Sequence, residues 1–112
     1  MDCIFCKIAA GQIPCQKLYE DEQILAFRDI QPQAPAHLLI IPKAHIEGAK
    51  DLTPEHAPLV GHIFAAIAQL ARQEGLDAGF RVVINSGQEG GQTVGHLHFH
   101  LLGGRQLGWP PG

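Results

Sequence analysis

The chain has 112 residues, of which 46% are hydrophobic and 17% are charged, and its formal net charge is −3 at pH 7. This composition predicts one folded domain spanning residues 1–112 and excludes an intrinsically disordered chain. No basic run suggests a nucleic-acid partner, and no apolar run approaches the roughly 18 residues that a membrane span requires. The N-terminal segment does not read as a signal peptide, so its three cysteines predict reduced thiols in a cytoplasmic protein.

The N-terminal part of the chain predicts a short helix, a hairpin and a buried strand. The segment CIFCKIAAG favours a short helix that ends at Gly11, with Pro14 just beyond it. In KLYEDEQILAFRDI, two β-forming runs flank the acidic EDE, which favours a hairpin. The nearly continuous apolar run HLLIIP, residues 37–42, predicts a strand that is buried on nearly both faces.

One long helix is the clearest predicted element, and we place it at about residues 53–74. Thr53 is a suitable N-cap, and Pro54 suits the first helical position. Apolar residues then recur at helical spacing until Gly75, which provides a C-terminal stop.

Two more strands follow the long helix, FRVVIN at 80–85 and HLHFHLL at 96–102, joined by the glycine-rich SGQEGGQTVG. With the hairpin and HLLIIP, they make five predicted strands. The order of elements predicts an α+β fold, in which one long helix and a short N-terminal helix accompany a mainly antiparallel five-stranded sheet.

Three of the seven histidines occupy alternate positions of the last predicted strand. Because residues i, i+2 and i+4 of a strand face the same side, His96, His98 and His100 should line one face. The apolar residues between them should line the opposite face, which reads as core. An unperturbed imidazole has a pKa of about 6.5, so the row can exchange protons near neutral pH.

The residues alone leave three interpretations of this row open. The histidines could be surface groups on a half-solvated strand. They could bind a metal, although the outer Cα atoms would be ~13 Å apart and an ion could comfortably take only two of them. They could also act in nucleophilic catalysis on phosphorus, with GQEGGQT offering backbone N–H groups to a phosphate.

Nucleophilic catalysis makes two further demands on the site. A backbone carbonyl that accepts the other ring N–H of the attacking imidazole would set its tautomer and stabilise its developing positive charge. A departing amine needs a proton, which a histidine or the hydroxyl group of Thr93 could supply.

Several motifs extend the pattern beyond the three histidines. HLHFHLL matches His-x-His-x-His with apolar intervening residues, and FRDIQPQAPAHLLIIPKAHI, GGQTVGHLHFHLLGGRQL and the terminal WPPG accompany it. With these motifs the chain resembles the Hint branch of the histidine triad superfamily over essentially its whole length. The resemblance implies a homodimer with an α+β fold that binds purine nucleoside monophosphates. It also implies hydrolysis of the phosphorus–nitrogen bond of nucleoside phosphoramidates, and of acyl-adenylates, without a cofactor for the chemistry.

The resemblance assigns catalytic roles to individual histidines. His98 would be the nucleophile that forms a nucleotidyl-histidine intermediate. His100 would contact the phosphate, and His96 would help to orient the site. His37 matches an upstream histidine that supports the nucleophile through hydrogen bonding.

The resemblance also assigns the nucleotide contacts. Asp29 would hold the ribose hydroxyls, and Trp109 would lie near the active site of the partner subunit. The residues that would contact the phosphate and the leaving group are Asn85, Gly91, Gln92 and Thr93. The apolar wall around the base would consist of Ile4, Phe5, Ile8, Phe27, Ile30 and Leu39. Gly95 departs from the larger residue that many relatives carry there, which predicts a roomier leaving-group side.

A C-x-x-C pair, Cys3 and Cys6, raises the separate question of zinc. By itself the pair is a weak signal, because cysteines at this spacing on a helical turn are often simply buried. Many bacterial-type relatives combine it with a histidine at the PKxH position and bind structural zinc. The resemblance therefore implies a tetrahedral Cys₂His₂ site formed by Cys3, Cys6, His45 and His96.

Three other functions remain open at the level of sequence. One is hydrolysis of dinucleoside polyphosphates by the same chemistry. Another is a nucleotide-binding interaction module with little physiological catalysis. The last is a zinc hydrolase that works through metal-bound water.

Overall fold

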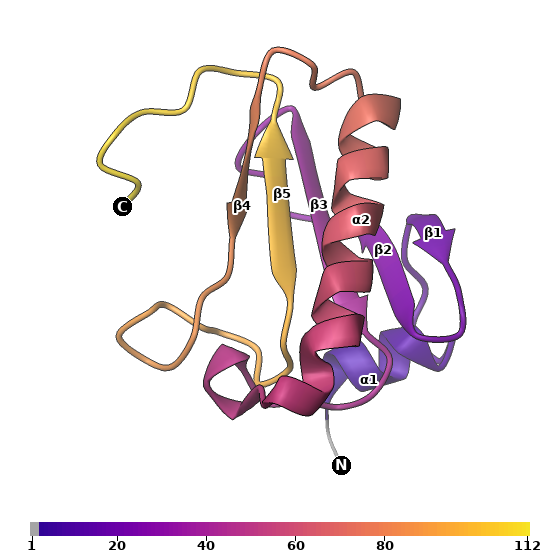
Figure 1. Cartoon of the computed structure of the whole chain (residues 1–112). Helices are drawn as coiled ribbons and strands as arrows, with labels where there is room; N and C mark the ends of the chain where they lie inside the picture. The colour runs from indigo at the N-terminus through magenta and orange to yellow at the C-terminus, as the bar shows by residue number, and fades with distance from the viewer. Residues whose placement is uncertain (1–2) are drawn as a thin grey trace.

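In the computed structural model, which describes residues 3–112, the strands form a five-stranded antiparallel sheet with the order β1-β2-β3-β5-β4 (Figure 1). The hairpin, the buried strand and the two late strands are all present, so the predicted α+β architecture is confirmed. The strands are β1 (Lys17–Glu20), β2 (Ile24–Arg28), β3 (Ala36–Pro42), β4 (Phe80–Val83) and β5 (Phe99–Gly103).

Two helices, α1 (Ile4–Ala9) and α2 (Ala57–Gln73), pack against opposite faces of this sheet. Alternate residues of β3 point to the two sides: Leu38 and Ile40 join the core beneath α2, while Leu39 joins the core beneath α1. All residues of β3 are buried, as the apolar run predicts. Neither helix is long and apolar enough to cross a bilayer, within the part of the chain that the structure describes.

The larger core lies between the sheet and α2. Leu97, Phe99 and Leu101, the apolar residues between and after the histidines, are at most 1% exposed and pack here. Complete burial of one such side chain stabilises the fold by about 1.5–3 kcal/mol. This packing sends the alternate residues to the opposite face, where α1 lies.

The β1–β2 hairpin turns at the acidic EDE, as predicted. The carboxylate of Asp21 accepts hydrogen bonds from the backbone N–H groups of Gln23 and Ile24, at 2.8 and 3.0 Å. Its other oxygen lies 2.7 Å from the hydroxyl of Tyr19 and 2.6 Å from Nε2 of His62, which ties the turn to α2.

The long helix starts later than the sequence predicts. Residues 54–56 form a 3₁₀ turn, and α2 covers Ala57–Gln73 rather than 53–74. The backbone N–H of Thr53 donates to Nδ1 of His56 at 2.9 Å, so a side chain closes this first, tighter turn.

Two strand boundaries also differ from the prediction. β4 ends at Val83 rather than at residue 85, and β5 covers Phe99–Gly103 rather than 96–102. Val83, the last residue of β4, pairs with His100, so the residues before His100 have no partner in β4. The N–H of Leu97 donates instead to the carbonyl of Ile46 at 2.6 Å, outside the sheet ladder.

Candidate active site and metal centre

The three histidines of HLHFHLL lie on the same side of the sheet, next to α1. The ring of Phe5 lies 6.0 Å from the ring of His96 and 5.1 Å from that of His98, centroid to centroid. The rings of His98 and His100 are 5.0 Å apart. The expected common face is therefore present, even though His96 and His98 precede the strand itself.

His98 is held in one tautomer by the backbone. The residue is only 5% exposed, and Nδ1 lies 2.6 Å from the carbonyl oxygen of His96. Because a carbonyl can only accept, Nδ1 carries the proton of the neutral ring and Nε2 carries a lone pair. This is the carbonyl contact that a nucleophilic imidazole requires.

His37 forms a hydrogen-bonded chain with His100. The backbone N–H of Gln33 donates to Nδ1 of His37 at 3.0 Å, so the neutral His37 ring carries its proton on Nε2. That Nε2 lies 2.9 Å from Nδ1 of His100 and 3.4 Å from a carboxylate oxygen of Asp29. His37 thus contacts His100 rather than the nucleophile candidate His98, which differs from the expected support of the nucleophile.

The environment of this pair disfavours positive charge. Burial lowers the pKa of His37, although the carboxylate of Asp29 opposes the shift. Burial, with repulsion from His98 and His37, lowers the pKa of His100 to about 4. Nε2 of His100 is buried and has no hydrogen-bond partner among residues 3–112. At neutral pH the His100 ring is therefore uncharged, and its buried Nε2–H has no partner among the described residues.

A second cluster brings together Cys3, Cys6, His45 and His96. Sγ of Cys3 lies 3.2 Å from Nδ1 of His96, and Sγ of Cys6 lies 3.2 Å from Nδ1 of His45 and 3.5 Å from Nδ1 of His96. All four potential ligand atoms lie within 4.8 Å of one another.

The chemistry of this cluster fits zinc. Bonds of 2.3 Å to sulfur and about 2.0–2.1 Å to nitrogen, arranged tetrahedrally, place ligand atoms roughly 3.3–3.8 Å apart. Nε2 of His96 lies 2.8 Å from the carbonyl oxygen of Pro42, and Nε2 of His45 lies 3.3 Å from a carboxylate oxygen of Glu47. Each Nε2–H therefore donates outward, which leaves both Nδ1 lone pairs facing the sulfurs.

One thiol of the cluster is prepared for ionisation. Burial opposes ionisation of Cys3, but the hydrogen bonds that its sulfur accepts from the backbone N–H of Cys6, at 3.2 Å, and from the side chain of Cys6 lower its pKa below the usual thiol value. Burial and the neighbouring Cys3 sulfur raise the pKa of Cys6. Since zinc binds the thiolate form, Cys3 is the better prepared of the two sulfur ligands.

The glycine-rich loop uses much of its own hydrogen-bonding capacity. The backbone N–H groups of Gly91 and Gln92 donate to the carbonyls of Gln88 and Gly87, each at 3.0 Å. The Gln92 side chain accepts from Gly87 N–H at 2.9 Å and donates to the carbonyls of Glu47 and Val94, at 2.7 and 3.0 Å. In this conformation Gln92 closes the loop, so these groups do not present the free phosphate donors that the sequence suggests.

The residues expected to form the apolar wall around the base include buried and exposed side chains. Phe5, Phe27 and Leu39 are buried together under α1, and Ile8 packs against them. Two expected wall residues lie outside this cluster, Ile4 at 47% exposed and Ile30 at 94% exposed.

The remaining expected contacts lie on loops and in the tail. Asn85 is half-buried just beyond β4, and Thr93 is exposed. Trp109 is 84% exposed. Asp29 is half-buried, and a carboxylate oxygen accepts from the N–H of Gln31 at 2.8 Å.

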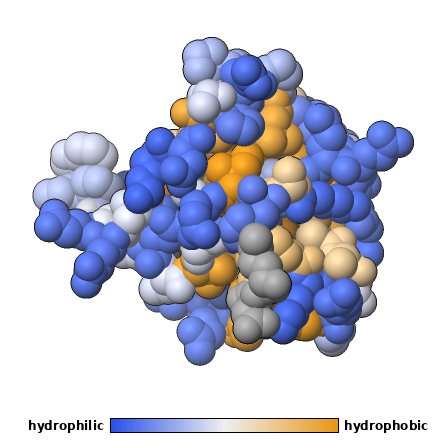
Figure 2. Space-filling view, turned by 90° about the horizontal axis from the view of Figure 1, so that it is seen from below, coloured by the Kyte–Doolittle hydropathy of each residue, from blue (hydrophilic) through white to orange (hydrophobic). Residues whose placement is uncertain are grey.

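One cavity is lined by Cys3 and His45 of the cysteine–histidine cluster, and a second cavity shares Glu47, Thr93 and Gly95 with it. Their volumes are about 430 and 310 Å³. A Cβ atom at Gly95 would lie 2.6 Å from a carboxylate oxygen of Glu47, so Glu47 occupies the space that the missing side chain leaves. Figure 2 shows the end of the molecule below the sheet, where apolar residues are exposed within a mainly hydrophilic surface.

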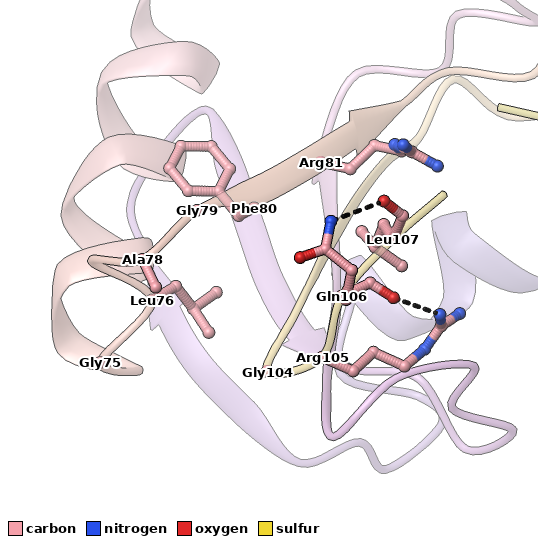
Figure 3. Close-up of a pocket in the computed structure, with 10 residues that line it drawn as sticks. All are labelled: Gly75, Leu76, Ala78, Gly79, Phe80, Arg81, Gly104, Arg105, Gln106 and Leu107. Atoms are coloured by element: carbon pink, nitrogen blue, oxygen red, sulfur yellow. Dashed lines mark hydrogen bonds between the residues drawn. The ribbon is translucent and has the colours of Figure 1, made fainter. Parts of the chain in front are cut away.

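Another cavity, of about 530 Å³, lies elsewhere, where the chain leaves α2 and enters β4. Figure 3 shows how residues 75, 76, 78–81 and 104–107 surround it. The guanidinium groups of Arg81 and Arg105 donate there to the backbone carbonyls of Gly108, Gln33 and Gln106. No histidine is among the described residues of its lining, so it is separate from the two clusters.

Comparison with known proteins identifies the family of this constellation. The family model described as "Scavenger mRNA decapping enzyme C-term binding" matches residues 2–108. An uncharacterized HIT-like protein of Synechococcus elongatus is 55% identical over 99% of this chain and 97% of its own length. The chain belongs to the histidine triad family.

Further members of the family agree with this assignment. The crystal structure of a HIT family hydrolase from Legionella pneumophila shares 54% identity, covers 99% of this chain and 100% of its own, and superposes with a TM-score of 0.98. A 14 kDa zinc-binding protein of Brassica juncea is 49% identical, over 99% of this chain and 100% of its own length.

Three groups in the site escaped the reasoning from sequence. The N–H of Gln33 and the carbonyl of Pro42 are backbone groups, which carry no side-chain signal. Glu47 could have been found, because it lies two residues after His45 and a short extended segment would place both on one side.

Proposed function

We propose that this protein is a Hint-type hydrolase that cleaves the phosphorus–nitrogen bond of purine nucleoside 5′-phosphoramidates, such as adenosine phosphoramidate or AMP-lysine, and releases AMP or GMP. The observation that carries this proposal is the His98 ring, whose Nδ1–H donates to the His96 carbonyl at 2.6 Å, so that the lone pair of the neutral ring lies on Nε2, the nitrogen that would attack phosphorus. Without the carbonyl, either ring nitrogen could carry the proton.

In the proposed reaction, Nε2 of His98 bonds to phosphorus as the P–N bond breaks. The bond pair leaves with the amine nitrogen, which takes up a proton from solvent water. A water molecule then attacks phosphorus and returns a proton to the solvent as the bond to His98 breaks and the nucleotide is released. The His96 carbonyl stabilises the positive charge on the His98 ring while it is bonded to phosphorus, because its dipole faces Nδ1–H.

Around this centre, His100 contacts a phosphoryl oxygen through its unpartnered Nε2–H. Asp29 binds the ribose hydroxyls, and the buried Phe5, Phe27 and Leu39 form the part of the base wall nearest the sheet. Asn85 and Thr93 reach the phosphate and leaving group from the loop that follows β4. No metal takes part in these steps.

Zinc has a structural role in this proposal. Cys3, Cys6, His45 and His96 would hold it, and the bound ion would stabilise the junction of α1, the segment after β3 and the start of HLHFHLL. The cluster needs reduced thiols, which suits a cytoplasmic protein.

A homodimer is the proposed assembly. The strand order places β4 at one edge of the sheet, and Phe80, Ile84 and Trp109 expose large apolar surfaces at 46%, 38% and 84%. Pairing of this edge with a second copy would cover Phe80 and Ile84 and bring Trp109 towards the partner's site. Sedimentation equilibrium tests the assembly, and a monomer at micromolar concentration would contradict it.

The direct test of function is release of AMP from adenosine 5′-phosphoramidate. Wild-type protein should turn the substrate over, and His98→Ala should lower kcat/KM by at least about three orders of magnitude. His56→Ala, a histidine in the 3₁₀ turn before α2, is the matched control and should keep its activity. Absence of turnover by wild type, or unchanged turnover in His98→Ala, would exclude the proposal.

Hydrolysis of dinucleoside polyphosphates is the second candidate. It is favoured by the matching family model, whose description names a scavenger mRNA decapping enzyme. The same attack by His98 would break a P–O bond and release a phosphate group that needs no proton. A higher kcat/KM for diadenosine polyphosphates than for phosphoramidates would favour this candidate over the first.

A further inference from the structure

The hydrogen bonds around His37 and His100 have a fixed direction. The N–H of Gln33 can only donate, so Nδ1 of His37 accepts at 3.0 Å. The neutral His37 ring then carries its proton on Nε2, which faces Nδ1 of His100 at 2.9 Å. His100 must accept there, so its own proton sits on Nε2, the buried atom without a partner in residues 3–112.

We propose that the backbone amide of Gln33 is a positioning group: through His37 it holds His100 as a fixed Nε2–H donor to a phosphoryl oxygen, and His100 does not supply the proton of the leaving group. The inference rests on the proposed function, because it says what His100 does in that reaction. The inference assigns a positioning role to the backbone N–H of Gln33, not to its side chain.

Proton balance is the reason why His100 is a donor rather than an acid. A neutral ring that gives up its Nε2 proton becomes an imidazolate unless Nδ1 gains a proton at the same time. The only proton at that position belongs to His37, which would become an imidazolate in turn. His37 cannot be replenished at Nδ1, because a second hydrogen there would face the N–H of Gln33 at 3.0 Å.

Asp29 also favours the His37 tautomer that carries its proton on Nε2. Its carboxylate oxygen lies 3.4 Å from Nε2 of His37 and attracts the proton to that nitrogen rather than to Nδ1. The carboxylate is therefore placed to keep His37 a donor, in addition to its proposed contact with ribose.

A metal held by Asp29, His37 and His100 is the competing interpretation, since their ligand atoms also lie within 4.8 Å of one another. Such an ion would need the lone pair of His37 at Nε2 and hence a proton at Nδ1. The N–H of Gln33 points at that nitrogen, so the geometry favours the hydrogen-bonded chain over the metal.

The first test reads the tautomers directly from the full-length protein. Long-range ¹H–¹⁵N correlation spectra of ¹⁵N-histidine-labelled protein distinguish pyrrole-type from pyridine-type ring nitrogens. His37 and His100 should each show a pyridine-type Nδ1 and a pyrrole-type Nε2, and His98 the reverse. A pyrrole-type Nδ1 in His37 would overturn the inference, as would saturable shifts of the His37 and His100 ring nitrogens on adding Zn²⁺ to the zinc-loaded protein.

Variants at Gln33 separate the amide from the side chain. Gln33→Pro removes the N–H and should give a mixture of His37 tautomers, whereas Gln33→Ala keeps the N–H and should keep the single tautomer. An unchanged single tautomer in a folded Gln33→Pro variant would contradict the role of the amide. If that variant does not fold, the wild-type spectrum alone decides.

The second test separates a donor from an acid by kinetics. His100→Gln retains an amide donor, so its kcat should lie within about tenfold of wild type, while His100→Ala should lose about 10²-fold. Each loss should be the same for AMP-lysine, with a basic amine, and for an anilide with an activated leaving group. A loss confined to AMP-lysine would show that His100 is the acid. Failure of wild type to cleave any phosphoramidate would reject the proposed function, and the tautomer spectra would still decide the inference.

Discussion

Two clusters of histidines lie on the α1 side of the sheet among the described residues. Both use imidazole rings, but the rings of one cluster use Nδ1 as the lone-pair nitrogen towards a ligand, and His100 of the other carries a proton on Nε2. In the cysteine–histidine cluster, His45 and His96 donate Nε2–H outward and turn their Nδ1 lone pairs towards two sulfurs. In the other cluster, His37 and His100 use Nδ1 as the acceptor, so Nε2 carries the proton. The first arrangement suits a metal ion, and the second suits a hydrogen-bond acceptor such as a phosphoryl oxygen.

The outer hydrogen-bond partner makes this difference. A carbonyl of Pro42 and a carboxylate of Glu47 accept from the first cluster, whereas a backbone N–H of Gln33 donates to the second. A neutral imidazole has one donor and one acceptor, so the partner on one nitrogen determines what the other can do. His98 lies between the clusters, and its own partner is the carbonyl of His96.

The largest expected effect comes from breaking the metal-ligand cluster. Cys6→Ser should remove stoichiometric zinc and with it the metal-linked stability, which is about 4 kcal/mol when free zinc is 1,000 times its Kd. Metal analysis and thermal unfolding with and without zinc would measure both. Cys15→Ser alters a half-buried cysteine outside the cluster and serves as the control. A Cys6→Ser protein that keeps one zinc per chain would contradict the ligand assignment.

The second cluster should make stability depend on pH. The pKa of His100 is lowered to about 4, chiefly by burial, against about 6.5 in the unfolded chain. Its contribution is therefore complete above pH 6.5 and is lost as the pH falls towards 4, because the unfolded state takes up the proton first. Denaturant unfolding at pH 7 and pH 4.5 should show about 1–2 kcal/mol less pH dependence in His100→Gln than in wild type. Equal dependence in the two proteins would contradict the buried, neutral state.

A smaller effect is expected from the outer partner of a metal ligand. Glu47→Gln removes the charged acceptor of His45 Nε2–H and should weaken zinc binding by about 10–100-fold. Competition with a chelator of known affinity would measure it, with Glu89→Gln on the exposed glycine-rich loop as the matched control. Equal affinities in the two variants would mean that Glu47 does not orient His45.

The sequence predicts the features that follow from side-chain periodicity. Alternation in HLHFHLL places Leu97 and Phe99 in the core and the histidines on the opposite face. The C-x-x-C pair and the PKxH histidine, interpreted through the family, identify the atoms that meet at the proposed metal centre. Each of these features depends on which side chains are present.

The sequence does not predict the features that depend on main-chain partners. The N–H of Gln33 and the carbonyl of Pro42 are main-chain groups of a kind that almost every residue has. Only the fold brings these two groups to a histidine ring nitrogen. The start of β5 at Phe99 depends on where its neighbour β4 ends. The pattern of apolar residues does not determine the end of β4. The resemblance assigns Gln92 to the phosphate, yet its side-chain amide is hydrogen-bonded to Gly87 and Val94 of its own loop and to the carbonyl of Glu47.

The central claim is that Nε2 of His98 becomes bonded to phosphorus. The most direct test is to mix the wild-type protein with a slowly hydrolysed nucleoside phosphoramidate and to quench the reaction rapidly without acid. Peptide mass spectrometry at alkaline pH then locates any bound nucleotide. We expect one nucleotidyl group per chain, located on His98 and absent from His98→Ala. A nucleotidyl group on His100 or His37, or turnover with no protein-bound nucleotide at any time point, would contradict it.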